Sequence, residues 1–109
     1  MYGRASWQDA VDELSRELRA LYGRRLRAVV LYGSRARGDA RPDSDIDLLA
    51  LLEPPVDEAS ELERIIAISS RISLERDILL SARPFDADRY STERSPFLLG
   101  VRREGRRVA

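Results

Sequence analysis

The stretch that decides the fold is residues 26–53, which read LRAVVLYGSRARGDARPDSDIDLLALLE. Two apolar runs, Leu26–Tyr32 and Asp45–Glu53, flank a polar segment that contains glycine and proline. Short apolar runs bounded by turn residues are typical of buried strands. The stretch therefore predicts a strand, then a loop or a short helix and loop over Arg35–Ser44, then a second strand.

A helix is predicted on the N-terminal side of this stretch. Ser6 and Asp9 have the spacing of a capping box, and Gly23 follows as a natural terminator. Between them, apolar residues recur at helical spacing: Trp7, Val11, Leu14, Leu18 and Leu21. This side of the helix, Trp7 included, is expected to face the core.

The C-terminal half predicts a second helix, a third strand and a last helix. Asp57 can cap a helix, and the residues expected to face inward are Leu62, Ile65, Ile66, Ser69 and Ile72. Leu74–Leu80 predicts a third strand that Pro84 ends, with an irregular segment after it. A short helix is predicted over about 96–104 behind Ser95-Pro96. The fold class expected is α/β (α+β): one domain over 1–109, with a small mixed sheet of three or more strands flanked by helices.

Composition excludes several kinds of chemistry. The 109 residues contain no Cys and no His, which excludes thiolate nucleophiles, imidazole acid–base catalysis and metal sites built on either residue. Catalysis would therefore depend on carboxylates, hydroxyls, arginines and a hard metal ion. The 19 basic residues, all arginine, balance 19 acids, which argues against a general nucleic-acid binder. The opening MYGRASWQDA lacks a secretory signal and no run is long enough to span a membrane, so a cytoplasmic protein is expected.

Acidic residues gather between Asp43 and Glu63, where there are eight acids and no base. Those at 57–63 are expected to form a solvated helix face. Asp45 and Asp47 differ, because they lie side by side on one face at the start of an otherwise apolar strand. Like charges this close repel unless a cation lies between them, so the pair predicts a site for Mg²⁺ or Mn²⁺.

A third carboxylate is expected from the next strand. If Leu74–Leu80 is a neighbouring strand, Asp77 stands beside Asp45 and Asp47, and is preferred to the competing acid Glu75. Three carboxylates on adjacent strands can hold two divalent cations for an in-line phosphoryl displacement.

An anion site is expected where the first strand ends. A glycine directly after a strand lets a phosphate approach the backbone, and the N–H groups that follow Gly33, together with the hydroxyl of Ser34, can bind it. Arg35 and Arg37 add charged donors close by. The ten residues between Ser34 and Asp45 are few enough to bring the phosphate and metal sites together.

The string LYGSRARGDARPDSDIDLLALLE, residues 31–53, resembles the signature of the DNA polymerase β-like nucleotidyltransferase superfamily. GSRARG followed by SDIDL is similar in particular to the minimal nucleotidyltransferases (MNT), the antitoxins of HEPN–MNT toxin–antitoxin systems. The signature covers residues 26–80, and the similarity extends to about residue 104.

This resemblance implies an enzyme that transfers AMP from ATP to a tyrosine of a HEPN ribonuclease toxin and so neutralises it. Gly33 and Ser34 would hold the β- and γ-phosphates, and Arg35, Arg37 and Ser44 are assigned to the same nucleotide site. It implies two Mg²⁺ ions, with Mn²⁺ as a substitute, bound by Asp45, Asp47 and Asp77. The hydroxyl would attack the α-phosphorus in line, and pyrophosphate would leave.

Other functions stay open at this stage. The protein could mask its toxin by binding alone, transfer a nucleotide to a small molecule, or be a structural domain with solvated acids. The apolar residues of the last helix are expected to pack on the sheet, although a toxin contact is the alternative. The basic residues around it could face an acidic partner: Arg102, Arg103, Arg106 and Arg107.

Overall fold

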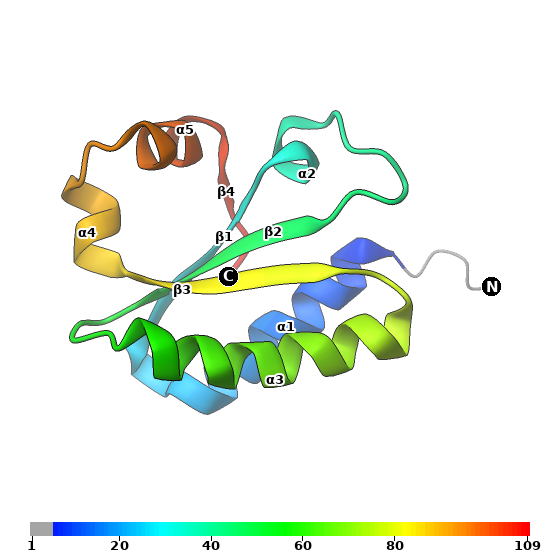
Figure 1. Ribbon diagram of the computed structural model, residues 1–109, viewed down its shortest axis with the longest axis horizontal. Coiled ribbons are helices and arrows are strands. Elements are labelled where there is room, and N and C mark those ends of the chain that lie inside the picture. The colour runs from blue at the N-terminus through cyan, green and yellow to red at the C-terminus, as the bar shows by residue number, and fades with distance from the viewer. Residues whose placement is uncertain (1–5) are drawn as a thin grey trace.

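The computed structural model describes residues 6–109 and contains a four-stranded mixed sheet of order β3-β2-β1-β4 with helices on both faces (Figure 1). The fold class expected from the sequence is therefore confirmed. In chain order the elements are α1 (Trp7–Tyr22), the 3₁₀ turn η1 (Gly23–Arg25), β1 (Leu26–Tyr32), α2 (Ser34–Arg37), β2 (Ile46–Leu52), α3 (Glu58–Arg76), β3 (Leu80–Asp86), α4 (Ala87–Thr92), α5 (Pro96–Glu104) and β4 (Arg106–Arg107).

The strand pairing brings three strand ends to one edge of the sheet. β1 and β2 are antiparallel, with Tyr32 at the end of β1 opposite Asp47 at the start of β2. β2 and β3 are parallel, with Asp47 beside Ser81 near the start of β3. Parallel neighbours need a crossover connection, and α3 provides it. The predicted acidic pair therefore lies at the edge of the sheet where β1 ends and where β2 and β3 begin.

The core lies mainly between the sheet and the two long helices α1 and α3, which run along the same face of the sheet (Figure 1). β2 is buried on both of its faces, because α4 and α5 cover part of the opposite side. The fully buried large side chains are Leu14, Leu18, Leu26, Val29, Leu31, Ile46, Leu48, Leu49, Leu52, Ile65, Ile72 and Leu98. Burial of this kind contributes about 25 cal/mol per Å² of apolar surface.

The first helix forms as predicted, with one difference near its end. Ser6 and Asp9 make the capping box, and Gly23 ends α1. Trp7 packs against the core as expected. Leu21, however, is 44% exposed, whereas its neighbour Tyr22 is buried.

The predicted third strand over Leu74–Leu80 is wrong. α3 continues through Arg76, and Asp77 ends it in the left-handed conformation with φ of 54°. Leu, Glu and Arg are strong helix formers. The extra turn of α3 is tied to α1, since Arg76 Nε donates to Glu13 Oε1 at 2.8 Å. β3 then starts at Leu80, whose N–H donates to Ser73 Oγ.

Pro84 does not end the third strand but lies inside it. β3 is an edge strand, and a proline is tolerated there because its missing N–H removes no ladder bond on the solvent side. The irregular segment expected after Pro84 contains α4, which Asp86 caps through the N–H groups of Asp88 and Arg89.

The last helix forms as predicted over Pro96–Glu104, capped by Ser95 and ended by Gly105. It packs on the sheet through Leu98 and Val101, which are buried. Arg102 does not face outward, because its guanidinium donates to the carbonyl oxygens of Tyr90 and Glu93 and so fixes α4 to α5.

The acids at 57–63 are not all solvated as expected. Glu61 is only 4% exposed. Its carboxylate accepts from the Tyr22 hydroxyl, Arg25 and Arg64. A buried carboxylate is tolerated when it is paired and hydrogen-bonded in this way.

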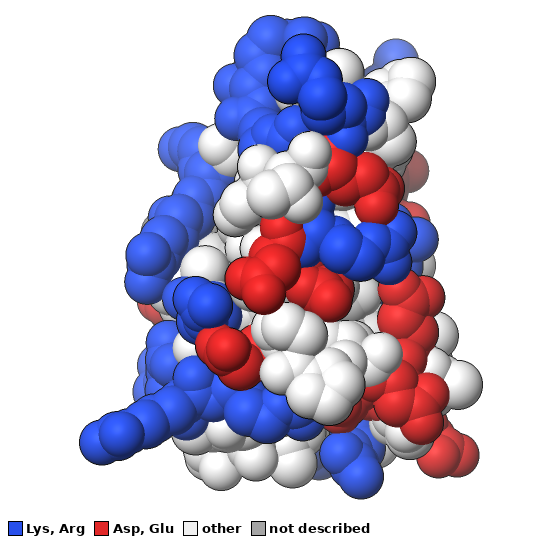
Figure 2. Space-filling model, turned by 90° about the vertical axis from the view of Figure 1, so that its left-hand side faces the viewer, with Lys and Arg blue, Asp and Glu red and all other residues white. Residues whose placement is uncertain are grey.

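Charges of both signs share the end of the molecule that Figure 2 shows, where arginines gather at the top and along the left of the view and acids lie at its centre and right. Within residues 6–109, every helix is too short or too polar to span a lipid bilayer. Residues 1–5, the first half of the opening that was predicted to lack a secretory signal, lie outside the described residues.

Candidate active site

Gly33 joins β1 to α2 in a conformation that requires glycine. Its φ of 77° and ψ of −157° lie in a region that other residues essentially avoid. A Cβ atom built on Gly33 would also collide with Oδ2 of Asp47. The carboxylate of Asp47 therefore lies directly against the backbone at the start of α2, as the prediction of joined phosphate and metal sites requires.

Asp45 and Asp47 are close enough to repel each other. Burial raises the pKa of Asp47 above its ordinary value, and the negative charge of Asp45 raises it further. The guanidinium groups of Arg83 and Arg37 act in the opposite direction. Asp45 is exposed one residue before β2, whereas Asp47 is half-buried within it. The pair thus has the arrangement that a divalent cation between two carboxylates would stabilise.

Ser34 and Arg37 flank this pair on the β1 side. Ser34 begins α2, a single turn in which the N–H groups of Ala36 and Arg37 both donate to the carbonyl of Gly33. Arg37 lies 3.3 Å from Asp39 and 3.7 Å from Glu104. A hollow of about 370 Å³ opens beside them, lined by Tyr32, Gly33, Arg37, Pro96, Phe97, Gly100, Val101 and Glu104.

Arg35 and Ser44, which were assigned to the nucleotide site, are engaged with the loop that follows α2. Nη2 of Arg35 donates to the carbonyls of Pro42 and Ser44, and its guanidinium lies 5.4 Å from the centre of the Trp7 ring. Ser44 Oγ accepts from the N–H of Arg41. In this structure both residues order the path from α2 to β2.

Asp77 does not join Asp45 and Asp47. It ends α3, and the β3 residue beside Asp47 is Ser81. Among residues 6–109, no three acidic side chains gather closely enough to hold a metal ion. The competing acid Glu75 lies on α3 and pairs with Arg71 at 3.2 Å. The expected cluster of three carboxylates on adjacent strands is therefore absent from the described part of the chain.

Three residues at the site were missed in the sequence: Arg83, Tyr32 and Phe97. Burial raises the pKa of the Tyr32 phenol, Arg83 opposes this effect, and Asp47 adds to it. The Phe97 ring lies edge-on to Tyr32, with 5.6 Å between the ring centres. The guanidinium carbon of Arg83 is 5.3 Å from the centre of the Phe97 ring. A correctly placed third strand would have revealed Arg83, since it shares a face with Ser81.

Two carboxylates fit one shared divalent cation, which would offset their repulsion and supply charge stabilisation to a bound phosphate. Gly33, Ser34 and Arg37 are the groups available to an anion on the other side. The arrangement thus suits a metal-assisted reaction at a phosphate.

Two comparisons with known proteins agree on the family of this chain. The model of the family described as "Nucleotidyltransferase domain" matches residues 11–99. The chain is 37% identical over 73 residues to "Putative protein adenylyltransferase MJ0141" of Methanocaldococcus jannaschii, covering 67% of this chain and 73% of that protein. It is 28% identical over 75 residues to "Putative protein adenylyltransferase MJ0604" of the same organism, covering 69% of each chain.

Two solved structures share the fold. A toxin–antitoxin crystal structure with AMP-PNP matches with a TM-score of 0.63 over 94% of this chain and 72% of that chain, at 16% identity. A mutant of the toxin–antitoxin MntA-HpeT matches with a TM-score of 0.57 over 90% of this chain and 71% of that chain, at 17% identity. At such identities these likenesses establish the fold alone.

Gly33→Ala should disable the site for two reasons. The new Cβ would collide with the Asp47 carboxylate, and alanine is disfavoured at the positive φ of this position. Gly23→Ala is the matched control: its φ is 57°, but a Cβ there has nothing within 4 Å. Both variants should lose about 1 kcal/mol of stability from the backbone conformation. Only Gly33→Ala should also lose nucleotide binding, measured by calorimetry. Equal binding by the two variants would contradict the role given to Gly33.

Asp47→Asn should stabilise the metal-free protein at neutral pH. The folded state holds the Asp47 proton more tightly than the unfolded chain, so stability falls as the pH rises from 3.8 through the raised folded pKa. Thermal unfolding in EDTA at pH 7 should therefore show a midpoint a few degrees higher for the variant, since about 1 kcal/mol moves it by about 4–8 °C in a small domain.

Adding Mn²⁺ should raise the midpoint of the wild type and leave that of Asp47→Asn unchanged. Glu75→Gln removes an acid away from the site and should respond to Mn²⁺ like the wild type. A wild-type protein indifferent to Mn²⁺ would argue against a cation between Asp45 and Asp47.

Proposed function

Because this chain belongs to the nucleotidyltransferase domain family, we propose that it transfers AMP from ATP to a tyrosine of a partner toxin in the cytoplasm and thereby acts as an antitoxin. The observation that carries the proposal is the contact between the Asp47 carboxylate and the Gly33 backbone. This contact joins the proposed cation site and the proposed phosphate site into one reaction centre.

The reaction forms a bond between the acceptor oxygen and the α-phosphorus and breaks the bond from that phosphorus to the bridging oxygen. The electron pair leaves with pyrophosphate. Gly33, Ser34 and Arg37 hold the phosphates, and Asp45 and Asp47 hold Mg²⁺, which Mn²⁺ can replace. An ion held there would supply positive charge to offset the charge that develops on the phosphate oxygens. The proton of the acceptor hydroxyl would pass to one of the two carboxylates, Asp45 or Asp47, which are the bases that the site offers.

A protein acceptor is favoured over a small molecule by the relatives. Both relatives from Methanocaldococcus jannaschii are named as protein adenylyltransferases. The two structural matches are toxin–antitoxin structures, one of them with the ATP analogue AMP-PNP. That the toxin is a HEPN ribonuclease and that a tyrosine accepts the nucleotide are parts of the proposal that come from the resemblance of the GSRARG and SDIDL motifs.

Incubation with Mg²⁺, each nucleoside triphosphate in turn and the product of a neighbouring toxin gene tests this function. The intact mass of the partner should rise by one or more adenylyl groups, and only with ATP. Asp45→Asn combined with Asp47→Asn should slow the transfer about a hundredfold or more, because the metal's stabilisation of the transition state is worth several kcal/mol. Glu75→Gln should transfer at the wild-type rate. An unmodified partner in a stable complex would contradict the enzyme and favour masking by binding.

Asp77→Asn tests whether Asp77 lies outside the site, at the end of α3, or beside Asp45 and Asp47 as the sequence predicted. Asparagine is well tolerated in the left-handed conformation that Asp77 adopts, so the change removes a charge without disturbing the end of α3. The initial rate of transfer should stay within about threefold of the wild type, far from the loss expected for Asp45→Asn combined with Asp47→Asn, because an exposed charge outside the site contributes little. A loss as large as that of the double variant would show that Asp77 reaches the reaction centre.

A further inference from the structure

Arg83 lies on the same face of the sheet as the acidic pair. It is opposite Leu49 in the register between β2 and β3, two residues along from the Asp47–Ser81 pair. Two strand residues correspond to about 7 Å, and neighbouring strands are about 4.8 Å apart. A long arginine side chain can span this distance, and the charge of Arg83 opposes the rise in pKa of both Asp47 and Tyr32.

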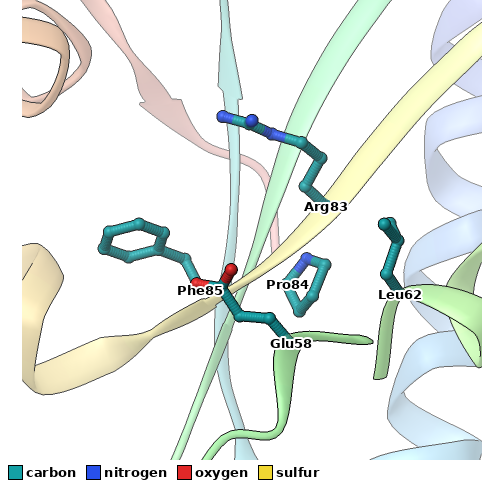
Figure 3. Close-up of a pocket in the computed structure, with 5 residues that line it drawn as sticks. All are labelled: Glu58, Leu62, Arg83, Pro84 and Phe85. Carbon is teal, nitrogen blue, oxygen red and sulfur yellow. The ribbon is translucent and has the colours of Figure 1, made fainter. Parts of the chain in front are cut away.

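The guanidinium of Arg83 is held in place without being neutralised. It stacks on the ring of Phe97, which in turn meets Tyr32 edge-on. Figure 3 shows the side chain extended away from Glu58, the acid that lines the same hollow of about 190 Å³. In residues 6–109 no carboxylate lies within 4 Å of Arg83, whereas eight other arginines there have such a partner.

A second hollow extends from Arg83 to Asp45. It has a volume of about 240 Å³, and its lining includes Asp45, Ser81 and Arg83. Arg37 is the other cation that acts on Asp47. The acidic pair therefore lies between two arginines, whereas the β3 position beside Asp47, where a third carboxylate was expected, holds the neutral Ser81.

We infer that Arg83 binds a phosphate of the nucleotide and supplies the positive charge that a second divalent cation would otherwise bring, so that this chain holds one divalent ion rather than two. The inference rests on the proposed function and refines its site. An arginine is suited to the task because its planar donors match phosphate oxygens and its charge persists at all working pH values. Phe97 fixes the guanidinium before the nucleotide arrives, which lowers the entropy lost on binding.

The stoichiometry of the cation provides the first test. Free Mn²⁺, measured by electron paramagnetic resonance during titration of the protein with AMP-PNP present, should fall by one ion for each protein–nucleotide complex. Two ions for each complex would overturn the inference while leaving the transferase proposal intact. Wild-type protein that binds no nucleotide under these conditions would overturn both.

The affinity for AMP-PNP in variants of Arg83 provides the second test. Arg83→Gln should weaken binding about 10- to 100-fold, the range expected for a hydrogen bond to a charged group. Arg83→Lys keeps the charge and should recover much of this loss. A glutamine variant that binds like the wild type, or a lysine variant as weak as glutamine, would overturn the role given to Arg83.

Arg89→Gln is the matched control. Arg89 also stacks on an aromatic ring, with 5.0 Å to the centre of Phe85, but it lies on α4 and pairs with Glu93. Its affinity for AMP-PNP should equal that of the wild type. Circular dichroism at the temperature of the titrations verifies that each variant is folded, so a loss confined to Arg83→Gln reports on binding and not on packing. The same loss in Arg89→Gln would point to general surface charge and overturn the inference.

Discussion

The contact between the Asp47 carboxylate and the backbone of Gly33 is the constraint on which the site depends. A side chain at position 33 would occupy the space of Oδ2, and the backbone there adopts a conformation that only glycine tolerates well. The antiparallel pairing of Tyr32 with Asp47 creates this closeness, because it brings the end of β1 to the start of β2. Strand register, glycine and carboxylate thus act as one unit, and a change in any of them would move the proposed phosphate site relative to the proposed metal site.

The sequence was sufficient for this unit because all its signals are local. The apolar run within Asp45–Glu53 predicts a buried strand with Asp45 and Asp47 on one face, and the structure has a buried strand over Ile46–Leu52. The turn at Gly33 and the caps at Ser6 and Ser95 are likewise short-range features with a defined stereochemistry. The family expected from these motifs is confirmed by the match over residues 11–99.

The third strand could not be placed from local signals. Leu74–Leu80 has apolar residues compatible with either a helix or a strand, and the choice is made by contacts distant in sequence, such as Arg76 with Glu13 on α1. Pro84 was predicted to end the strand because a proline is tolerated inside a strand chiefly at the edge of a sheet. Whether β3 is an edge strand is a property of the whole sheet and not of the local sequence. The same error assigned Asp77 to the site and hid Arg83. The burial of Glu61 was missed for a related reason, since its partners Tyr22 and Arg25 lie 39 and 36 residues away in the sequence.

The structure brings Arg83 to the site in place of the expected Asp77, and this exchange changes the charge of the site. Three carboxylates would leave one negative charge more than a single divalent ion offsets, and would call for a second ion. Two carboxylates balance one divalent ion, and the charge of a bound triphosphate is then left to Arg37 and Arg83 on either side. A fixed guanidinium also differs from a metal ion in its action, because it stabilises charge on phosphate oxygens but does not lower the pKa of an attacking hydroxyl in the way a bound ion does. In the proposed reaction, activation of the acceptor would therefore fall to an ion held between Asp45 and Asp47 and to those two carboxylates, which would concentrate the chemistry of the site at the start of β2.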